Sequence, residues 1–297
     1  AYEKKAIEDY RYFVERINTL IHTPDLDPVT FLNFENVESY SQKISAPYRL
    51  DCALTYQVSE KAQQDAAPKD RVERELNTNE WKTILEKAWN AGIPHVIFTG
   101  GEPTKRPDLV SLISFSEELG IVTGLLTDGI KLGDKQYLQE LLQSGLDHIM
   151  MLCDERDNKF WLSLKTVLAE DIFTTVHVTI TPENKNNIES LLEKLAKANA
   201  TSLSLSVSDM ALRDLLKGAQ QSAIEHGLSL VWDLPVPYSR YNPVALELQE
   251  GGERLAEGAG KAWLYVEPDG DVLPAQGINK VMGNLLHDSW KDIWKHR

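Results

Sequence analysis

The chain has 297 residues, of which 42% are hydrophobic, and its formal net charge is −14 at pH 7. This length suits one large α/β domain, with or without a small appendage. The acidic charge argues against nucleic acid or an anionic membrane as a partner, because binding to either depends on clustered lysine and arginine. The sequence also lacks a run of about 18 apolar residues, so we expect no membrane-spanning helix.

Residues 1–22 predict an amphipathic helix. The apolar residues of one face recur at spacings of three or four: Ile7, Tyr10, Val14, Ile17 and Ile21. The segment that follows is rich in proline and acidic residues and predicts an irregular arm. We therefore expect residues 1–46 to form a helical N-terminal arm.

From residue 47 onward, strand patterns alternate with helix patterns. The expected strands are "YRLDCALTY", "HVIFT", "IVTGLLT", "HIMMLC", "TTVHVTI", "SLSLSV" and "LSLVWDL". Such alternation implies parallel strands joined by right-handed helical crossovers. We therefore predict an α/β fold, a partial (β/α)6 TIM-like barrel over residues 47–234. Ligand sites in these sheets lie at the carboxyl ends of the strands, which places 100–102, 127–129 and 153–154 on one rim.

The C-terminal part predicts a small extension over residues 235–297. It begins with a connection rich in proline and glycine, and we expect Trp232 and Tyr238 near its start to line a cavity. The stretch "AWLYVEPDGDVLPAQ" predicts a β-hairpin around Asp-Gly, and "SWKDIWKHR" predicts a short terminal helix.

The turn "TGGEP" after the second strand is the first candidate site. Gly100 and Gly101 allow positive φ and the close approach of a ligand to the backbone. Exposed carbonyls and Glu102 can accept hydrogen bonds from an ammonium group, while Pro103 stiffens the exit and donates nothing. The turn therefore suits a positively charged amino group; the alternative is a tight strand-to-helix turn with a solvated glutamate.

Three segments follow one another along the chain: this turn, then "GLLTDGIKL", then "GLDHIMML". In this order they resemble the radical S-adenosylmethionine (SAM) superfamily. The stretch "YVEPDGDVLPAQG" and the later Gly-Asn-Leu resemble the family's SPASM or twitch-type extension, so that the resemblance covers residues 47–297. It implies SAM as the cofactor. The residues that it implies for SAM binding are Gly100, Gly101, Glu102, Pro103, Thr127, Asp128 and Asp154, the last toward the ribose hydroxyls.

The cysteines depart from this family. Its defining Cys-x3-Cys-x2-Cys motif follows the first strand, and in this chain the three positions fall on Val58, Ala62 and Asp65. A register that begins at Cys52 reaches Tyr56 and Ser59 and contains no second cysteine either. Because iron–sulfur clusters are held by cysteine thiolates, occasionally with histidine, we expect no iron–sulfur cluster and no other metal.

The two cysteines of the chain, Cys52 and Cys153, are expected to pack as small buried hydrophobes. Two thiols also argue against a disulfide-rich secreted fold and fit the reducing cytoplasm. In the extension, the positions at which the family carries further cysteines hold Glu257 and Ala275. We therefore expect no auxiliary cluster.

Three hypotheses on function follow. The first is a cytoplasmic pseudoenzyme that binds SAM, a peptide or another small molecule without radical chemistry. The second is an altered, cysteine-substituted form of an active radical SAM/SPASM enzyme. The third is a barrel reused for acid–base catalysis by Glu102, Asp128 and His177, since histidine titrates near neutral pH.

Overall fold

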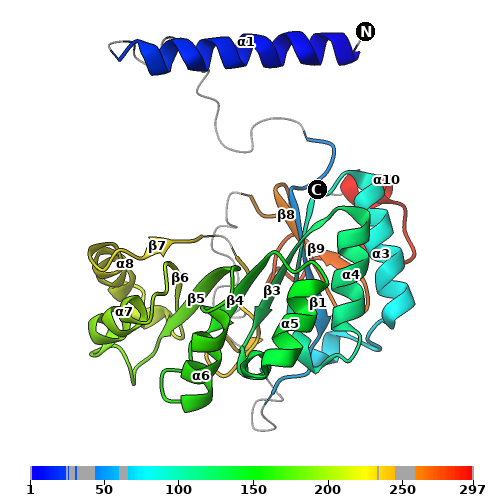
Figure 1. Ribbon diagram of the computed structural model, residues 1–297. Helices are drawn as coiled ribbons and strands as arrows, with labels where there is room; N and C mark the ends of the chain where they lie inside the picture. The colour runs from blue at the N-terminus through cyan, green and yellow to red at the C-terminus, as the bar shows by residue number, and fades with distance from the viewer. Residues whose placement is uncertain are drawn as a thin grey trace. The chain divides into compact units, whose positions relative to one another are not determined.

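The structure is a computed structural model that describes residues 2–24, 26, 31, 44–59, 66–232, 234–244 and 258–295. The chain divides into two compact units, Ala1–Lys43 and Ile44–Arg297. The first unit contains helix α1 (Tyr2–His22), as the apolar periodicity predicts (Figure 1). No helix among the described residues is long and apolar enough to cross a membrane.

The second unit is built on one sheet of ten strands, in the order β10-β9-β8-β1-β2-β3-β4-β5-β6-β7. Strands β1 to β7 pair in parallel. Their bounds are β1 (Arg49–Thr55), β2 (His95–Gly100), β3 (Val122–Thr127), β4 (His148–Leu152), β5 (Phe173–Ile180), β6 (Ser202–Val207) and β7 (Ser229–Leu230). The sheet does not close on itself, and the predicted partial barrel is confirmed.

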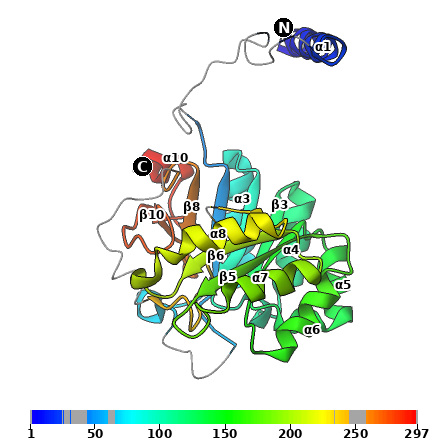
Figure 2. The same ribbon diagram turned by 90° about the vertical axis from the view of Figure 1, so that its left-hand side faces the viewer.

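Helices follow the strands and cover one face of the sheet (Figures 1 and 2). They are α3 (Thr78–Ala91), α4 (Leu109–Leu119), α5 (Lys135–Gln143), α6 (Asn158–Val167), α7 (Ile188–Lys197) and α8 (Leu215–Glu225). Local signals set their ends. For example, Asn77 and Glu80 form a capping box at the start of α3, and Gly92 ends it with a left-handed φ of 84°.

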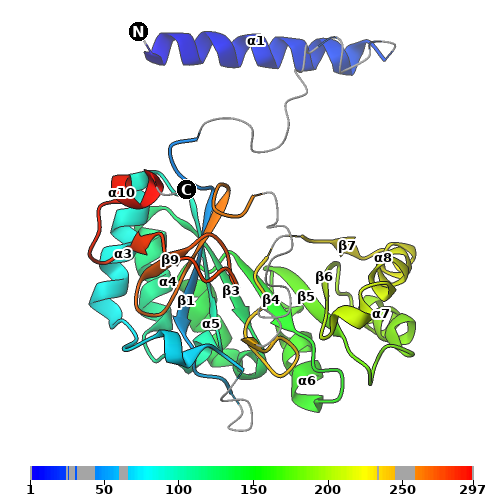
Figure 3. The same cartoon turned by 180° about the vertical axis from the view of Figure 1, so that it is seen from behind.

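The C-terminal segment extends the same sheet. Strands β8 (Trp263–Val266) and β9 (Asp271–Leu273) form the predicted antiparallel hairpin, followed by β10 (Gly283–Asn284) and α10 (Trp290–Lys295). Strand β8 lies parallel to β1, with Leu264 opposite Leu50. The last strands of the chain therefore pair with the first strand of the barrel, as Figure 3 shows from behind.

The two faces of the sheet bury different side chains. Toward the helices, alternate strand residues such as Cys52, Phe98 and Ile149 join one large apolar core. On the opposite face, Ile97, Leu126 and Met150 form a smaller cluster that Leu234 packs against. The chain after β7 therefore passes through the concave side of the partial barrel.

Candidate functional site

A pocket with about 640 Å³ of space, part of it open to solvent, lies at the carboxyl ends of the strands. Its walls come from residues 58–59 after β1, 101–102 after β2, 128–130 after β3 and 152–160 from the end of β4 into α6, together with 238–241 from the segment that follows β7. This is the rim that the strand order predicts. Four carboxylates line the pocket: Glu102, Asp128, Asp154 and Asp157.

The two glycines of the turn after β2 allow close contact with the chain that leaves β1. A Cβ on Gly100 would lie 2.4 Å from the Thr55 carbonyl oxygen, and a Cβ on Gly101 would lie 2.3 Å from that of Gln57. Gly101 N donates to Thr55 O at 2.8 Å, and Glu102 N donates to Gln57 O at 2.7 Å. The sequence suggested that the glycines admit a ligand; in the structure the backbone of residues 55–57 occupies the space that they leave.

Glu102 is buried, with 3% of its surface exposed. Its Oε1 accepts hydrogen bonds from Thr104 N (2.9 Å), Thr104 Oγ1 (2.6 Å) and Thr127 Oγ1 (2.7 Å), and its Oε2 accepts one from Asp128 N (2.7 Å). The alternative of a solvated glutamate is therefore wrong. The carboxylate joins the ends of β2 and β3, and Oε2 keeps acceptor capacity toward the pocket.

Burial and the nearby negative charge of Asp128 raise the pKa of Glu102 to about 8, although the hydrogen bonds from Thr104, Asp128 and Thr127 act against this rise. Asp128 itself is half-buried and is held from two sides. Its Oδ1 accepts from Ile130 N at 2.9 Å, and its Oδ2 accepts from the hydroxyl of Ser59. Ser59 and Asp128 thus join the chain after β1 to the chain after β3 beside the pocket.

Asp154 lies on the opposite wall and contacts a segment whose role the sequence did not predict. Its Oδ2 accepts a hydrogen bond from Arg240 Nη2 in an ion pair, and Tyr241 Oη lies 3.5 Å from Oδ1. The side chains of Arg240 and Asp154 are 42% and 30% exposed. Residues near 240 were expected to form only a connection, because proline and glycine dominate that stretch.

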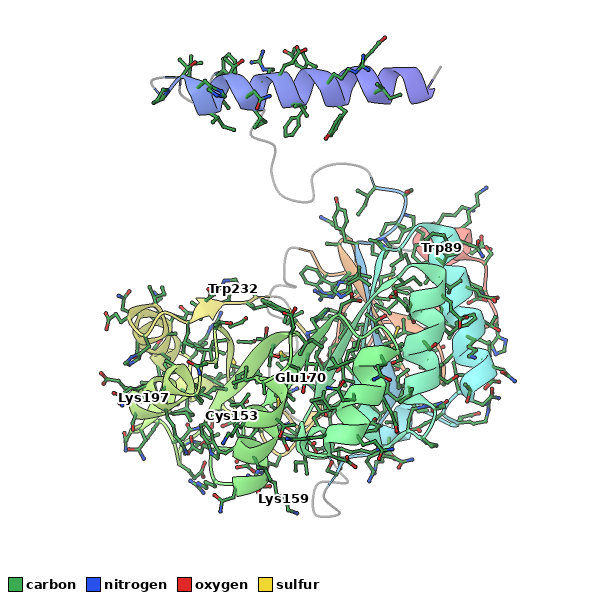
Figure 4. All side chains as sticks on the ribbon, viewed as in Figure 1. Trp89, Cys153, Lys159, Glu170, Lys197 and Trp232 are labelled. Atoms are coloured by element: carbon green, nitrogen blue, oxygen red, sulfur yellow. The ribbon has the colours of Figure 1, made fainter. Side chains whose placement is uncertain are left out.

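Tyr238 and Trp232 differ in position. Tyr238 lines the pocket, as predicted, and is only 2% exposed. Trp232 does not belong to the pocket wall; it is 56% exposed and lies beyond β7, so the prediction for this residue is wrong (Figure 4). Leu234, two residues later, packs against the cluster of Ile97, Leu126 and Met150. Trp232 therefore lies near the concave side of the sheet in sequence but is not part of the pocket.

His177 lies on β5 with 1% of its surface exposed. Its Nδ1 is 3.0 Å from Ser204 Oγ and its Nε2 is 2.9 Å from Ser206 Oγ. Burial lowers the pKa of His177 to about 4, so the ring is neutral at pH 7. Glu102 and Asp128 are thus brought together by a direct hydrogen bond, whereas the polar partners of His177 are serines of β6.

The residues at the cysteine positions carry little metal-binding chemistry. Val58 lines the pocket and is 8% exposed; Ala62, Asp65 and Glu257 lie outside the described residues. Cys52 is buried in the core, and burial raises the pKa of both cysteine thiols. Within the described ranges, no group of three or more His, Cys, Asp or Glu side chains could hold a metal ion. Ala275 packs near Trp263.

Solved structures first define the class of fold. The structure of SuiB from Streptococcus suis bound to precursor peptide SuiA matches with a TM-score of 0.63 and 16% identity, over 98% of this chain and 78% of that one. Native anSMEcpe with bound AdoMet matches with a TM-score of 0.60 and 12% identity, over 84% of this chain and 80% of that one. The fold is thus the partial barrel of these proteins.

Sequence comparison then finds a family to which the central segment is similar. Residues 52–165 match the family model of the Radical SAM superfamily. These residues extend from β1 into α6 and contain the turn at 100–102, Asp128 and Asp154. This part of the chain is therefore similar to the Radical SAM superfamily, and it supplies most of the pocket wall.

Curated relatives with sequence similarity include PqqA peptide cyclases. The protein of Gluconobacter oxydans (strain 621H) is 43% identical over 82 residues, which are 28% of this chain and 23% of the relative. That of Methylobacterium sp. (strain 4-46) is 27% identical over 262 residues, 76% of this chain and 66% of the relative. The chain thus spans less than two thirds of the length of these two curated relatives.

Proposed function

We propose that this chain is a radical-SAM-type protein that binds SAM, a related small molecule or a peptide in the rim pocket and does not perform radical chemistry. The observation that carries the proposal is Val58. Its apolar side chain lines the pocket at the first of the family's three cysteine positions.

An iron–sulfur cluster does not fit the residues present. The sequence holds only two cysteines, and Cys52 is buried in β1 within the apolar core while Cys153 lies after β4. Valine and alanine have no donor atom, and the single carboxylate of Asp65 is a hard ligand that suits such a cluster poorly. We therefore propose that the domain has lost the ligands of the cluster.

SAM itself fits the chemistry of the pocket better. It carries a sulfonium and an ammonium group, and four acidic side chains line the pocket. A bound ammonium group would favour the ionised form of Glu102 over the protonated form that its raised pKa gives near neutral pH. We propose that the Gly101 backbone and Glu102 Oε2 accept from the ammonium group, that Asp128 adds negative charge, and that Asp154 accepts from the ribose hydroxyls. Ile130, Leu152 and Phe160 supply apolar contact in the same pocket. Gly100, Pro103 and Thr127 would support the site by holding the turn and Glu102.

A peptide is the second proposed ligand. SuiB was solved with its precursor peptide SuiA, and the curated relatives are named PqqA peptide cyclase. We propose a peptide partner for this chain by that similarity, together with a degenerate SPASM or twitch-type role for the extension at 235–297. We also propose the expected domain bounds, with a helical arm at 1–46 and the barrel at 47–234. A cytoplasmic location is a further proposal.

Isothermal titration with SAM tests the proposal directly. We expect weak binding by the aerobically purified, iron-free protein, because no iron is present to chelate the ligand. The Asp154→Asn variant should bind more weakly, while Asp171→Asn, which lies between α6 and β5, should match the wild type. Absence of heat at millimolar SAM would remove SAM as the ligand. Stoichiometric iron and sulfide with reductive cleavage of SAM in an anaerobic preparation would overturn the loss of radical chemistry.

The second candidate, acid–base catalysis, has one observation in its favour. Glu102 has a pKa of about 8 and accepts a hydrogen bond from the backbone of Asp128, so it could exchange a proton near neutral pH. The engagement of His177 by two serines counts against the three-residue form of this hypothesis. The other alternative, an altered form of an active enzyme, is tested by the codons of the native gene at positions 58, 62 and 65.

A further inference from the structure

The segment 234–244, which we call the strap, crosses the pocket side of the partial barrel. Leu234 packs against the cluster of Ile97, Leu126 and Met150. Tyr238 packs edge-to-face on Tyr56, with ring centroids 5.5 Å apart and an interplanar angle of 84°. The buried side chain of Tyr238 and the partly buried side chain of Leu234 therefore fix the first half of the strap, because both remove apolar surface from water.

Backbone and side-chain hydrogen bonds add to this attachment. Val236 N donates to Gln276 Oε1 at 3.1 Å, Tyr238 N donates to Gly100 O at 2.7 Å, and Val244 N donates to Ala66 O at 2.7 Å. Three prolines lie in the same stretch, at 235, 237 and 243, and each fixes its own φ. The strap is thus held on both sides of its tip.

The tip itself is a tight turn. Ser239 N donates to Asn242 O at 3.2 Å, and Asn242 N donates to Ser239 O at 3.1 Å. This turn presents Arg240 and Tyr241 to Asp154, and the guanidinium of Arg240 lies 4.5 Å from the centroid of the Tyr241 ring. Arg240 is also the only cation in the described lining of the pocket.

The contact of the tip with the pocket wall is weak compared with the anchors. Both partners of the Arg240–Asp154 pair are substantially exposed, and such ion pairs typically contribute about 0.2–1 kcal/mol because water screens them. The guanidinium can therefore leave Asp154 at small cost while Leu234 and Tyr238 stay in place. Asp154 is one of the carboxyl side chains that line the pocket.

We propose that Arg240 occupies Asp154 in the ligand-free protein and is displaced by the ligand, so that Arg240 sets the specificity of the pocket. A ligand must offer hydrogen-bond donors, such as paired hydroxyls or an ammonium group, that replace the guanidinium on Asp154. Arg240 also opposes cationic ligands by its charge until it moves. The SAM measurements below rest on the proposed function, whereas the measurement on the free protein does not.

The free protein is tested by NMR of the arginine side chains, with the Arg240 Nε–H signal assigned by its loss in Arg240→Lys. We expect restricted rotation of the guanidinium in the wild type and faster rotation in Asp154→Asn, in which the contact of Arg240 with Tyr241 can still slow it. Free rotation in the wild type would overturn the inference, whatever SAM does.

The ligand step is tested by titrating SAM into variants. Arg240→Gln should bind SAM about three- to fivefold more tightly, since the competing pair is worth up to about 1 kcal/mol. The same substitution in an Asp154→Asn background should give less than half of that gain. Arg74→Gln is the matched control, because Arg74 forms a similarly exposed pair with Glu80 outside the pocket; it should leave the affinity unchanged.

The outcomes separate the two proposals. One outcome is that SAM binds the wild type while Arg240→Gln weakens binding, and another is that Arg240 stays restrained in the complex. In either case Arg240 is a ligand contact and its displacement is wrong, whereas SAM binding stands. If SAM binds no variant, SAM binding and its displacement of Arg240 both fail, and a restrained guanidinium is then only a structural ion pair.

Discussion

Tyr238 donates its backbone N–H to the carbonyl oxygen of Gly100 at 2.7 Å, although Gly100 lies within the radical SAM match at 52–165 and Tyr238 lies beyond its end. The turn after β2 is therefore held by two neighbours, the chain after β1 and the strap. This packing explains why the turn requires small residues irrespective of any ligand, and it allows the contributions of folding and binding to be separated by mutation.

Gly101→Ala should destabilise the fold. Its Cβ would lie 2.3 Å from the Gln57 carbonyl oxygen, a backbone atom that cannot move away cheaply. We expect a loss of about 1–3 kcal/mol in the free energy of unfolding, the usual cost of overpacking. Urea denaturation measures it. Gly218→Ala in α8 is the control, because nothing lies within 4 Å of its added Cβ, and it should stabilise by up to about 1 kcal/mol. Equal effects of the two substitutions would contradict the packing described for the turn.

Glu102 should make stability fall as the pH rises above neutral. Its folded pKa of about 8 lies above the ordinary value of 4.5, so the folded state binds the proton more tightly. The resulting stabilisation is complete below pH 4.5 and is lost as the pH rises through 8. Between pH 6.5 and 8 the wild type should lose on the order of 1.5 kcal/mol relative to Glu102→Gln. Urea midpoints at these two pH values measure the difference, and parallel curves for both proteins would refute the raised pKa.

His177 should act in the opposite direction and in a lower window. Its folded pKa of about 4 lies below the ordinary 6.5, so the unfolded chain takes up the proton first. Stability from this group is complete above pH 6.5 and is lost as the pH falls toward 4, by roughly 3 kcal/mol. We expect His177→Gln to have a shallower acid limb in thermal unfolding between pH 6.5 and 4. A wild-type curve that coincides with that of the variant would exclude the effect.

Cysteines placed at the family's three positions should give the chain the capacity to bind a cluster. We expect the triple variant Val58→Cys, Ala62→Cys and Asp65→Cys to bind iron and sulfide after anaerobic reconstitution, because three thiolates then stand at the family's spacing. The bound cluster is measured by visible absorbance from sulfur-to-iron charge transfer and by chemical analysis of the iron content. A variant with the same three residues changed to serine is the control and should bind none. Failure of the cysteine variant to gain iron over that control would indicate that three thiols at these positions are not sufficient for a cluster in this chain.

Much of the barrel could be predicted from the sequence because its signals are local. The β-rich runs that became β2 and β3, the caps of α3 and the glycine after it each depend on a few neighbouring residues. The Asp-Gly hairpin of β8 and β9 was predicted for the same reason. The position of Glu102 on the rim followed from strand order alone.

The parts that were missed depend on contacts between distant residues. Nothing near Trp263 indicates that β8 will pair with β1, and nothing near Arg240 indicates an ion pair with Asp154. The sequence correctly indicated that positions 100 and 101 need residues without a Cβ. The backbone that requires this space is that of residues 55–57, and the periodicity of a sequence carries no information on which distant segment packs against a turn.

The pairing of β8 with β1 has a consequence for synthesis of the chain on the ribosome. Residues 263–266 are translated more than two hundred positions after the strand that they cover. Until they emerge, the outer edge of β1 presents unpaired peptide groups, and such edges recruit other chains. Nascent or C-terminally truncated protein should therefore depend on chaperones far more than the finished chain.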